Sequence, residues 1–336
     1  MTKVKFSIGI DLANLTFVVS VLTHHDKEFI TKQFNNEQLG FDEFVSWLKK
    51  NKVKSDNSVI VMESTGVYSE KLCYFLYQKG YLISVENALK VKRAFGISPR
   101  KNDIIDSKRI AEYAFRFYDE LKFWKPAEQL IEEVKSLLSL REYLRIQVSS
   151  HMASFKALKK KEIQSKLAID THLSVIDDFK IKIKSIEEEI KVLVSSDINI
   201  LHKINCLISI PGVGFLLSVN LMVVTNAFKE NIDYRTLASY IGIAPIEHTS
   251  GTSVNKKVNK KFGHSRLKKL FYLCSMNTVR HKSFFYPYYN RKVAQGKNKM
   301  TVLNNISNKM LRIACGIIKS GKPFIPNYCS LNPNFV

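Results

Sequence analysis

Long apolar runs are missing from this chain of 336 residues. No stretch of about 20 uninterrupted apolar residues occurs, which argues against a membrane-spanning helix. The apolar start, residues 6–22, follows two lysines as in a signal peptide, but Asp11 and Asn14 interrupt it and no small-residue cleavage site follows. We therefore expect neither a secretory signal nor a membrane partner.

Cysteine, glycine and proline are also scarce. The five cysteines are odd in number, widely spaced and without a C-x-x-C pair, which indicates reduced thiols in a cytoplasmic protein. The eight histidines show no metal-ligand spacing, so we predict no zinc site. With only 13 Gly and 8 Pro against 45% apolar residues, the composition excludes collagen-like, low-complexity and wholly disordered chains.

Acidic residues are few, 30 against 52 Lys and Arg, so the formal net charge is +22. None lies beyond Glu247, whereas 17 Lys and Arg residues lie between Lys256 and Lys322. Nucleic acid is the partner that this excess favours, because Lys and Arg release counterions from phosphates. The alternative is a generally basic surface without a specific partner.

The first part of the chain alternates between strand and helix patterns. Strands are expected at residues 6–10, 16–22, 28–34, 59–62 and 81–85, and helices at 41–50, 68–78 and 103–118. This order predicts an α/β domain with a mixed sheet over residues 1–125.

The rest of the chain predicts an all-α region. The 84 residues from Ala127 to Ile210 contain neither Gly nor Pro, and two apolar stripes within them indicate two long helices. We expect an antiparallel coiled-coil hairpin over residues 126–204, turning near 160–172, as an oligomerisation or spacer arm. A plain helical bundle is the alternative. Residues 205–325 form a basic, mostly helical third part, with helices at 265–281 and 303–319 and loops marked by glycines.

Four acidic residues stand out in this basic chain. Asp11 and Glu63 end two predicted strands, where the sites of α/β sheets usually lie. Asp103 and Asp106 are three residues apart at a predicted helix start, and can therefore face one point. Four carboxylates that converge repel one another unless cations neutralise their charge. Mg²⁺ binds such oxygen ligands and supports phosphoryl transfer. Alternatively Asp11 simply ends its strand, Glu63 lies on the surface and Asp103 caps the helix.

Two further motifs lie in the basic third part. Gly212 and Gly214, in a Pro-Gly-Val-Gly turn between apolar helical patterns, can present backbone N–H groups to a DNA phosphate, or can form an ordinary interhelical turn. Ser250 lies beside Gly251 in a predicted loop that leads into Lys256, Lys257, Lys260 and Lys261. A serine in such surroundings can attack a phosphodiester, although small loop serines are common.

The ordered set of motifs resembles DEDD-type transposases of the insertion sequence 110 family, which are related to Piv-type DNA invertases. The resemblance spans nearly the whole chain. Its motifs are Ile-Gly-Ile-Asp11, Glu63-Ser-Thr-Gly-Val-Tyr, Lys-Asn-Asp103-Ile-Ile-Asp106, Ile-Pro-Gly-Val-Gly214, Leu237-Ala-Ser-Tyr-Ile-Gly-Ile-Ala-Pro245, Thr-Ser250-Gly and Gly263-His-Ser-Arg266-Leu-Lys-Lys-Leu270.

The resemblance implies a RuvC-like (ribonuclease H fold) first domain whose four carboxylates, Asp11, Glu63, Asp103 and Asp106, bind Mg²⁺. It implies that Ser250 joins DNA through a phosphoserine. Thr249 stands where Gln is expected and His264 where Asn is usual, and the first departure leaves Ser253 as an alternative nucleophile. Gly212, Gly214, the four lysines and Arg266 are the candidate nucleic-acid contacts.

The resemblance also implies partners: element and target DNA, a structured guide RNA, and a second or further copy of the chain in a dimer or tetramer. One protomer's carboxylates would then meet another's Ser250. We expect a DNA recombinase. A Holliday-junction-type nuclease, which needs no Ser250, and a non-catalytic nucleic-acid-binding protein are the alternatives.

Overall fold

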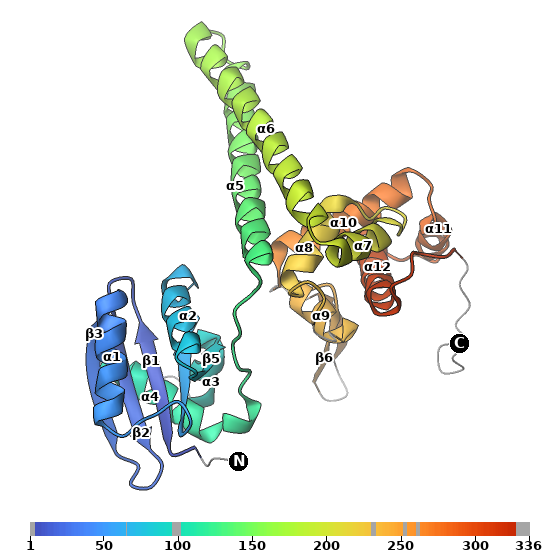
Figure 1. Cartoon of the computed structure of the whole chain (residues 1–336). Coiled ribbons are helices and arrows are strands. Elements are labelled where there is room, and N and C mark those ends of the chain that lie inside the picture. Colours follow the sequence, from blue (N-terminus) through green and yellow to red (C-terminus); the bar gives the residue numbers. More distant parts are fainter. Residues whose placement is uncertain are drawn as a thin grey trace. The chain divides into compact units, whose positions relative to one another are not determined.

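A computed structural model describes residues 4–64, 66–95, 102–229, 233–250, 254–259 and 263–326, with the backbone alone for 245–250 and 254–259. The chain divides into two compact units, residues 1–126 and 127–336, each of which is described by itself (Figure 1).

Unit 1 contains a mixed five-stranded sheet. Its strands are β1 (Phe6–Leu12), β2 (Thr16–Thr23), β3 (Phe29–Asn35), β4 (Ser58–Glu63) and β5 (Leu82–Glu86), in the order β3-β2-β1-β4-β5. The first three strands pair antiparallel, while β4 runs parallel to both β1 and β5. The mixed α/β sheet predicted from the sequence is confirmed.

Helices cover both faces of this sheet. They are α1 (Gln38–Lys50), α2 (Glu70–Gln78), α3 (Ala88–Phe95) and α4 (Asp103–Arg116), with short 3₁₀ turns at Gly66–Ser69 and Tyr118–Glu120. On one face Ile8, Ile10 and Met62 are buried against α1 and α2. On the other, Val59 and Val61 pack against α3 and α4. This alternation is the period of two that a sheet covered on both faces requires.

The apolar start of the chain forms β1 and β2, whose register places Ile8 opposite Val21 and Ile10 opposite Val19. Both strands are buried along most of their length, which explains the nearly continuous apolar run. In the described parts of the chain, no helix is long and apolar enough to cross a bilayer.

Unit 2 begins with two 30-residue helices, α5 (Gln129–Leu158) and α6 (Lys166–Ser195), which pack on each other as a hairpin (Figure 1). The turn ends earlier than expected, because Ser165 caps α6 by accepting a bond from the Ala168 N–H. An ion pair between Arg141 and Glu187 (2.6 Å) joins the helices. Coiled-coil packing of this hairpin stays a prediction.

The remaining helices of unit 2 are α7 (Ile198–Ile208), α8 (Phe215–Val224), α9 (Tyr234–Ile241), α10 (Ser265–Arg280), α11 (Tyr286–Ala294) and α12 (Lys299–Ser320). They share one apolar core with the base of the hairpin, including Val134 and Ile190. Where the sequence predicted a loop around Ser250, the chain instead forms an antiparallel ribbon of β6 (Pro245–Ser250) and β7 (Val254–Asn259). That prediction was wrong, because glycine spacing does not reveal strand pairing.

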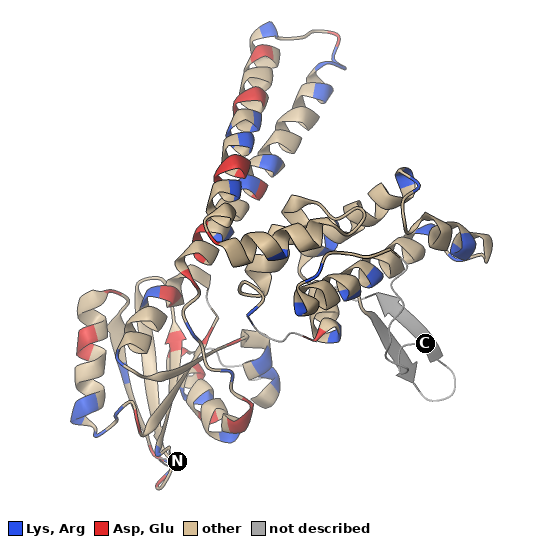
Figure 2. Ribbon diagram, turned by 45° about the vertical axis from the view of Figure 1, so that its right-hand side comes forward, with Lys and Arg blue, Asp and Glu red and all other residues tan. Residues whose placement is uncertain are grey.

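Acidic residues are unevenly distributed along the chain. Figure 2 shows acidic residues on unit 1 and on the α5–α6 hairpin. Helices α10, α11 and α12 carry Lys and Arg without any acidic residue (Figure 2).

Candidate functional site

Asp11 and Glu63 lie next to each other at one end of the sheet. They follow Ile10 and Met62, which are partners in the parallel register of β1 and β4. Neighbouring strands are roughly 4.8 Å apart, so the two backbones are close. Ile10 and Met62 are fully buried on the α1 side, so by alternation Asp11 and Glu63 face the α4 side.

Helix α4 lies directly on β1 at Gly9. A Cβ atom there would be 2.2 Å from both the Ser107 carbonyl oxygen and the Ala111 nitrogen, which is closer than real Cβ contacts. A hydrogen bond between the hydroxyls of Ser20 in β2 and Ser107 in α4 (2.8 Å) also holds the helix on the sheet at this point. Only glycine therefore fits at position 9 without moving the helix.

The direction of α4 brings its acidic first turn to the Asp11 end of β1. Phe115, in the last turn of the helix, contacts His24, with ring centroids 4.6 Å apart. The backbone N–H of His24 bonds to the carbonyl of Lys5 just before β1. The start of the helix, with Asp103 and Asp106, therefore lies toward the carboxyl end of β1.

Asn102, and not Asp103, caps α4. The Asn102 side chain accepts a hydrogen bond from the Ile104 N–H (3.0 Å), which satisfies one free donor of the helix start. Asp103 is exposed and Asp106 is half-buried. Neither carboxylate is needed as the cap, although both benefit from the positive end of the helix dipole.

Glu63 and Asp106 line one small cavity of about 20 Å³, together with Lys92 of α3 and Arg109 of α4. This volume accommodates about one water molecule or one ion of that size. The structure thus brings Glu63 and Asp106 together, with Asp11 on the neighbouring strand. Two basic side chains offset the negative charge of this region.

The carboxylate oxygens have the donor chemistry that Mg²⁺ prefers, and the cavity has room for one ion. Within the described residues, however, no three Asp, Glu, His or Cys side chains are grouped so that they could hold a metal. The four carboxylates therefore share one end of unit 1 without forming an assembled ion site.

Sequence reasoning missed Glu86 at the end of β5. Glu86 is the register partner of Glu63 and is 7% exposed. It accepts a hydrogen bond from the Ser84 hydroxyl (3.1 Å), and the Lys90 ammonium lies 3.2 Å from its carboxylate. The available signal was a third strand-end acid followed four residues later by a lysine, the spacing of a helical ion pair.

Ser250 lies in unit 2, at the end of β6, where its backbone pairs with Val254. Lys256 and Lys257 pair through their backbones with His248 and Glu247 in the same ribbon. Ser253, Lys260 and Lys261 lie outside the described residues.

The turn at Gly212 and Gly214 connects α7 to α8. The Val213 N–H bonds to the Ile210 carbonyl (2.9 Å), and Gly212 has a φ of 87°, which favours glycine. A Cβ at Gly212 would be 2.2 Å from the Thr278 side chain, so packing against α10 requires glycine there. Gly214 is exposed and precedes α8 with open space around it, so of the two it is the more accessible to a phosphate.

Arg266 is half-buried near α5 rather than fully exposed. Its Nη2 atom is buried and has no hydrogen-bond partner among the described residues. Burial lowers the pKa of its guanidinium, Glu142 opposes that effect, and the cations Arg141 and Arg145 add to it. Arg266 lines a cavity of about 340 Å³, which an anion would have to enter to reach the buried nitrogen.

His264 has a capping role that the sequence did not reveal. Its Nδ1 accepts a hydrogen bond from the Leu267 N–H (3.2 Å) at the start of α10. Asn, the usual residue at this place in the resemblance, is among the most favourable N-caps. His264 therefore caps the helix as Asn would. Burial lowers the pKa of its imidazole.

Comparisons with known proteins match both units. A family model described as "Transposase", of the DEDD type named for IS110, matches residues 8–159. A second, described as "Transposase IS116/IS110/IS902 family", matches residues 204–290. The matched segments include the carboxylates of unit 1 and Ser250 of unit 2.

Curated relatives match most of the chain. Pilin gene-inverting proteins of Moraxella lacunata and Moraxella bovis are each 27% identical over 325 residues, which cover 95% of this chain and 98% of each relative. An insertion element IS110 protein of Streptomyces coelicolor, described as uncharacterized, is 27% identical over 115 residues, 34% of this chain and 28% of that protein.

Proposed function

Because this chain belongs to the IS110/IS116/IS902 family of transposases, we propose that it cuts and rejoins DNA strands to move or invert a DNA segment. The observation that carries the proposal is the position of Asp11, Glu63 and the acidic start of α4 at one end of the sheet. The names of the Moraxella relatives, which invert a pilin gene, support the same class of reaction.

Unit 1 would act as a RuvC-like nuclease domain. The mixed strand order β3-β2-β1-β4-β5 supports this interpretation. Asp11, Glu63, Asp103 and Asp106 would hold Mg²⁺ when nucleic acid binds. The ion would supply charge stabilisation to the phosphate that is cut. Lys92 and Arg109, which line the same cavity as Glu63, would bind and orient that phosphate.

Ser250 would be the nucleophile. Its Oγ would attack the phosphorus and lose its proton. The bond between the phosphorus and the oxygen of the leaving strand would break, and that strand oxygen would gain a proton. A hydroxyl of the second strand would then attack the phosphoserine, which releases Ser250 and joins the strands. Each step exchanges one phosphate ester for another, so no external energy source is needed.

The remaining assignments concern binding. Gly214 and the basic residues Lys256, Lys257, Lys260, Lys261 and Arg266 would contact nucleic acid, with Gly212 shaping its turn. A structured guide RNA is part of the proposal because the resemblance to the family implies one, and the charge of +22 suits RNA as well as DNA. The α5–α6 hairpin would join copies of the chain, so that carboxylates of one protomer act with Ser250 of another.

Ser250→Ala tests the nucleophile against the matched variant Ser253→Ala. On DNA carrying both ends of the element, Ser250→Ala should lower the yield of covalent protein–DNA adduct by about 10³-fold or more, because the attacking oxygen is removed. DNA binding should survive, and Ser253→Ala should form adducts normally. Adducts in Ser250→Ala that vanish in Ser253→Ala would reassign the nucleophile. Strand cleavage without adducts in the unmodified protein would favour a nuclease instead.

A further inference from the structure

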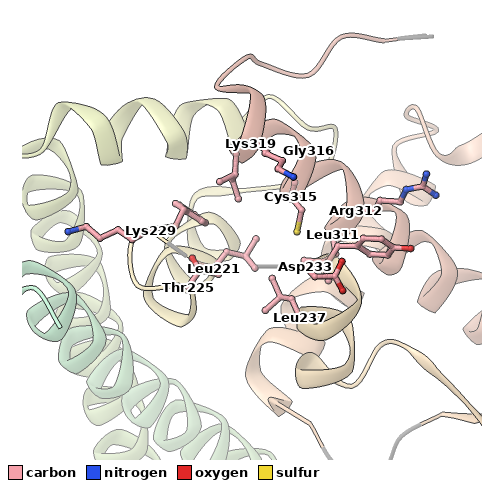
Figure 3. A pocket seen from close by; sticks show the side chains of 14 residues that line it. Leu221, Thr225, Lys229, Asp233, Leu237, Leu311, Arg312, Cys315, Gly316 and Lys319 are labelled. Atoms are coloured by element: carbon pink, nitrogen blue, oxygen red, sulfur yellow. The ribbon is translucent and has the colours of Figure 1, made fainter. Parts of the chain in front are cut away.

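A cavity in the described part of unit 2 lies between α8, α9 and α12 (Figure 3). Its volume is about 620 Å³, within the range of small-molecule sites. One face of α12 lines it through Arg312, Cys315, Gly316 and Lys319, which follow the three- and four-residue spacing of a helix. This face is therefore a regular feature of α12.

The floor of the cavity is apolar. Leu221 of α8, Leu237 of α9 and Leu311 of α12 line it, and Figure 3 shows the Cys315 sulfur among them. Burial raises the pKa of the Cys315 thiol to about 11, so this sulfur is an uncharged part of the floor at neutral pH. Such a floor suits a flat, weakly polar group.

The rim is positively charged. Arg312 and Lys319 supply this charge, whereas Lys229, which lies opposite Arg312 in Figure 3, forms an ion pair with Glu128. The one acidic lining residue, Asp233, caps α9 by accepting bonds from two backbone N–H groups (3.2 Å each). Arg312 and Lys319 outnumber this one carboxylate, so the rim favours an anion.

Gly316 lines the cavity and has open space beside it. A Cβ added there would meet no atom within 4 Å, although glycine inside a helix is unfavourable relative to alanine. Packing does not require glycine at this position, in contrast to Gly212. The open space is consistent with a site for a ligand.

We propose that this cavity takes up one unpaired nucleotide of a bound nucleic acid, with the base on the apolar floor and a phosphate at Arg312 and Lys319. Tyr234 lines the cavity, and the Arg312 guanidinium lies 5.9 Å from the centre of its ring. Unpaired bases stack on such rings irrespective of sequence, and cations bind the phosphate. The inference rests on the proposed function, since it takes nucleic acid as the ligand of unit 2.

Gly316→Leu tests this by filling the cavity without changing a charge. The full chain is titrated into duplexes that carry one 2-aminopurine, either paired or in a single-base bulge, in an all-DNA duplex and in an all-RNA duplex. The unmodified protein should change the fluorescence of the bulged base, and the duplex that responds identifies the source. Gly316→Leu should weaken this response roughly tenfold while its affinity for the fully paired duplex stays the same.

Ser320→Leu is the control, because it adds the same side chain to an exposed position of α12 outside the cavity. It should behave like the unmodified protein, and the thermal unfolding of both variants should show that they fold. An unchanged response in Gly316→Leu would overturn the inference, as would equal weakening for paired and bulged duplexes. Adduct formation by Ser250 is measured separately, so a failure of base capture leaves the proposed function standing, and the reverse also holds.

Discussion

The two units hold their candidate catalytic groups in different ways. In unit 1, Asp11 and Glu63 follow Ile10 and Met62, which are fully buried, so the sheet core fixes the carboxylates. In unit 2, Ser250 ends a ribbon of two strands that pair with each other in a sheet of their own. Two-stranded ribbons are marginally stable alone. Under the proposed function, unit 1 would be the rigid part that positions a phosphate, and the ribbon would be a more adaptable element that brings the nucleophile.

The difference between the two units can be tested by replacing one glycine with alanine in each. Gly9→Ala in unit 1 should have the largest effect, because the new methyl group would overlap the backbone of α4 at Ser107 and Ala111. We expect a loss of about 1–3 kcal/mol in the free energy of unfolding, together with loss of DNA cleavage. Fluorescence of Trp47 and Trp124, both in unit 1, monitors its unfolding in urea. Unchanged stability would show that α4 is not held against β1.

Gly316→Ala in unit 2 is the matched substitution and should act in the opposite direction. The methyl group meets no atom within 4 Å, and alanine lowers the entropy of the unfolded chain. We expect unit 2 to gain about 0.4–1 kcal/mol, measured by the helical circular dichroism signal, which comes mostly from this unit. Destabilisation would mean that α12 does not have this open face.

The smallest effect concerns pH. Because burial lowers the pKa of His264 below its usual 6.5, the unfolded chain binds a proton more readily than the folded one. This contribution to stability is therefore fully present above about pH 6.5 and is lost as the pH falls toward the folded pKa. His264→Asn keeps a capping side chain but removes the titration. Unfolding midpoints at pH 7.5 and 5.5 should differ less in this variant, and an equal difference would contradict the assignment.

Much of unit 1 could be predicted from the sequence, because its strands carry strong local patterns. The runs around Ile8, Val19 and Ile60 are apolar and bounded by turns, so strands and sheet followed directly. The sequence predicted that Asp11 and Glu63 both lie at strand ends. It did not predict that they are neighbours, because this depends on the register of parallel strands that are distant in sequence.

Other features could not be predicted, for physical reasons. The strand-end position of Glu86 is visible in the sequence, but its place beside Glu63 depends on the pairing of β4 with β5, which nothing local in the sequence indicates. The β6–β7 ribbon contains polar and basic residues without an apolar alternation, so its strands left no hydrophobic signal. The role of His264 as a cap depends on the conformation of one side chain, which composition does not determine.

We propose that the carboxylates of unit 1 and Ser250 of unit 2 take part in one reaction. The most direct measurement is the yield of DNA-linked Ser250, identified by mass spectrometry, in Asp11→Asn and in the unmodified protein. We expect Asp11→Asn to bind DNA normally but to form no DNA-linked Ser250. A full yield of this adduct in Asp11→Asn would show that Ser250 reacts without the carboxylates and would rule out a shared reaction.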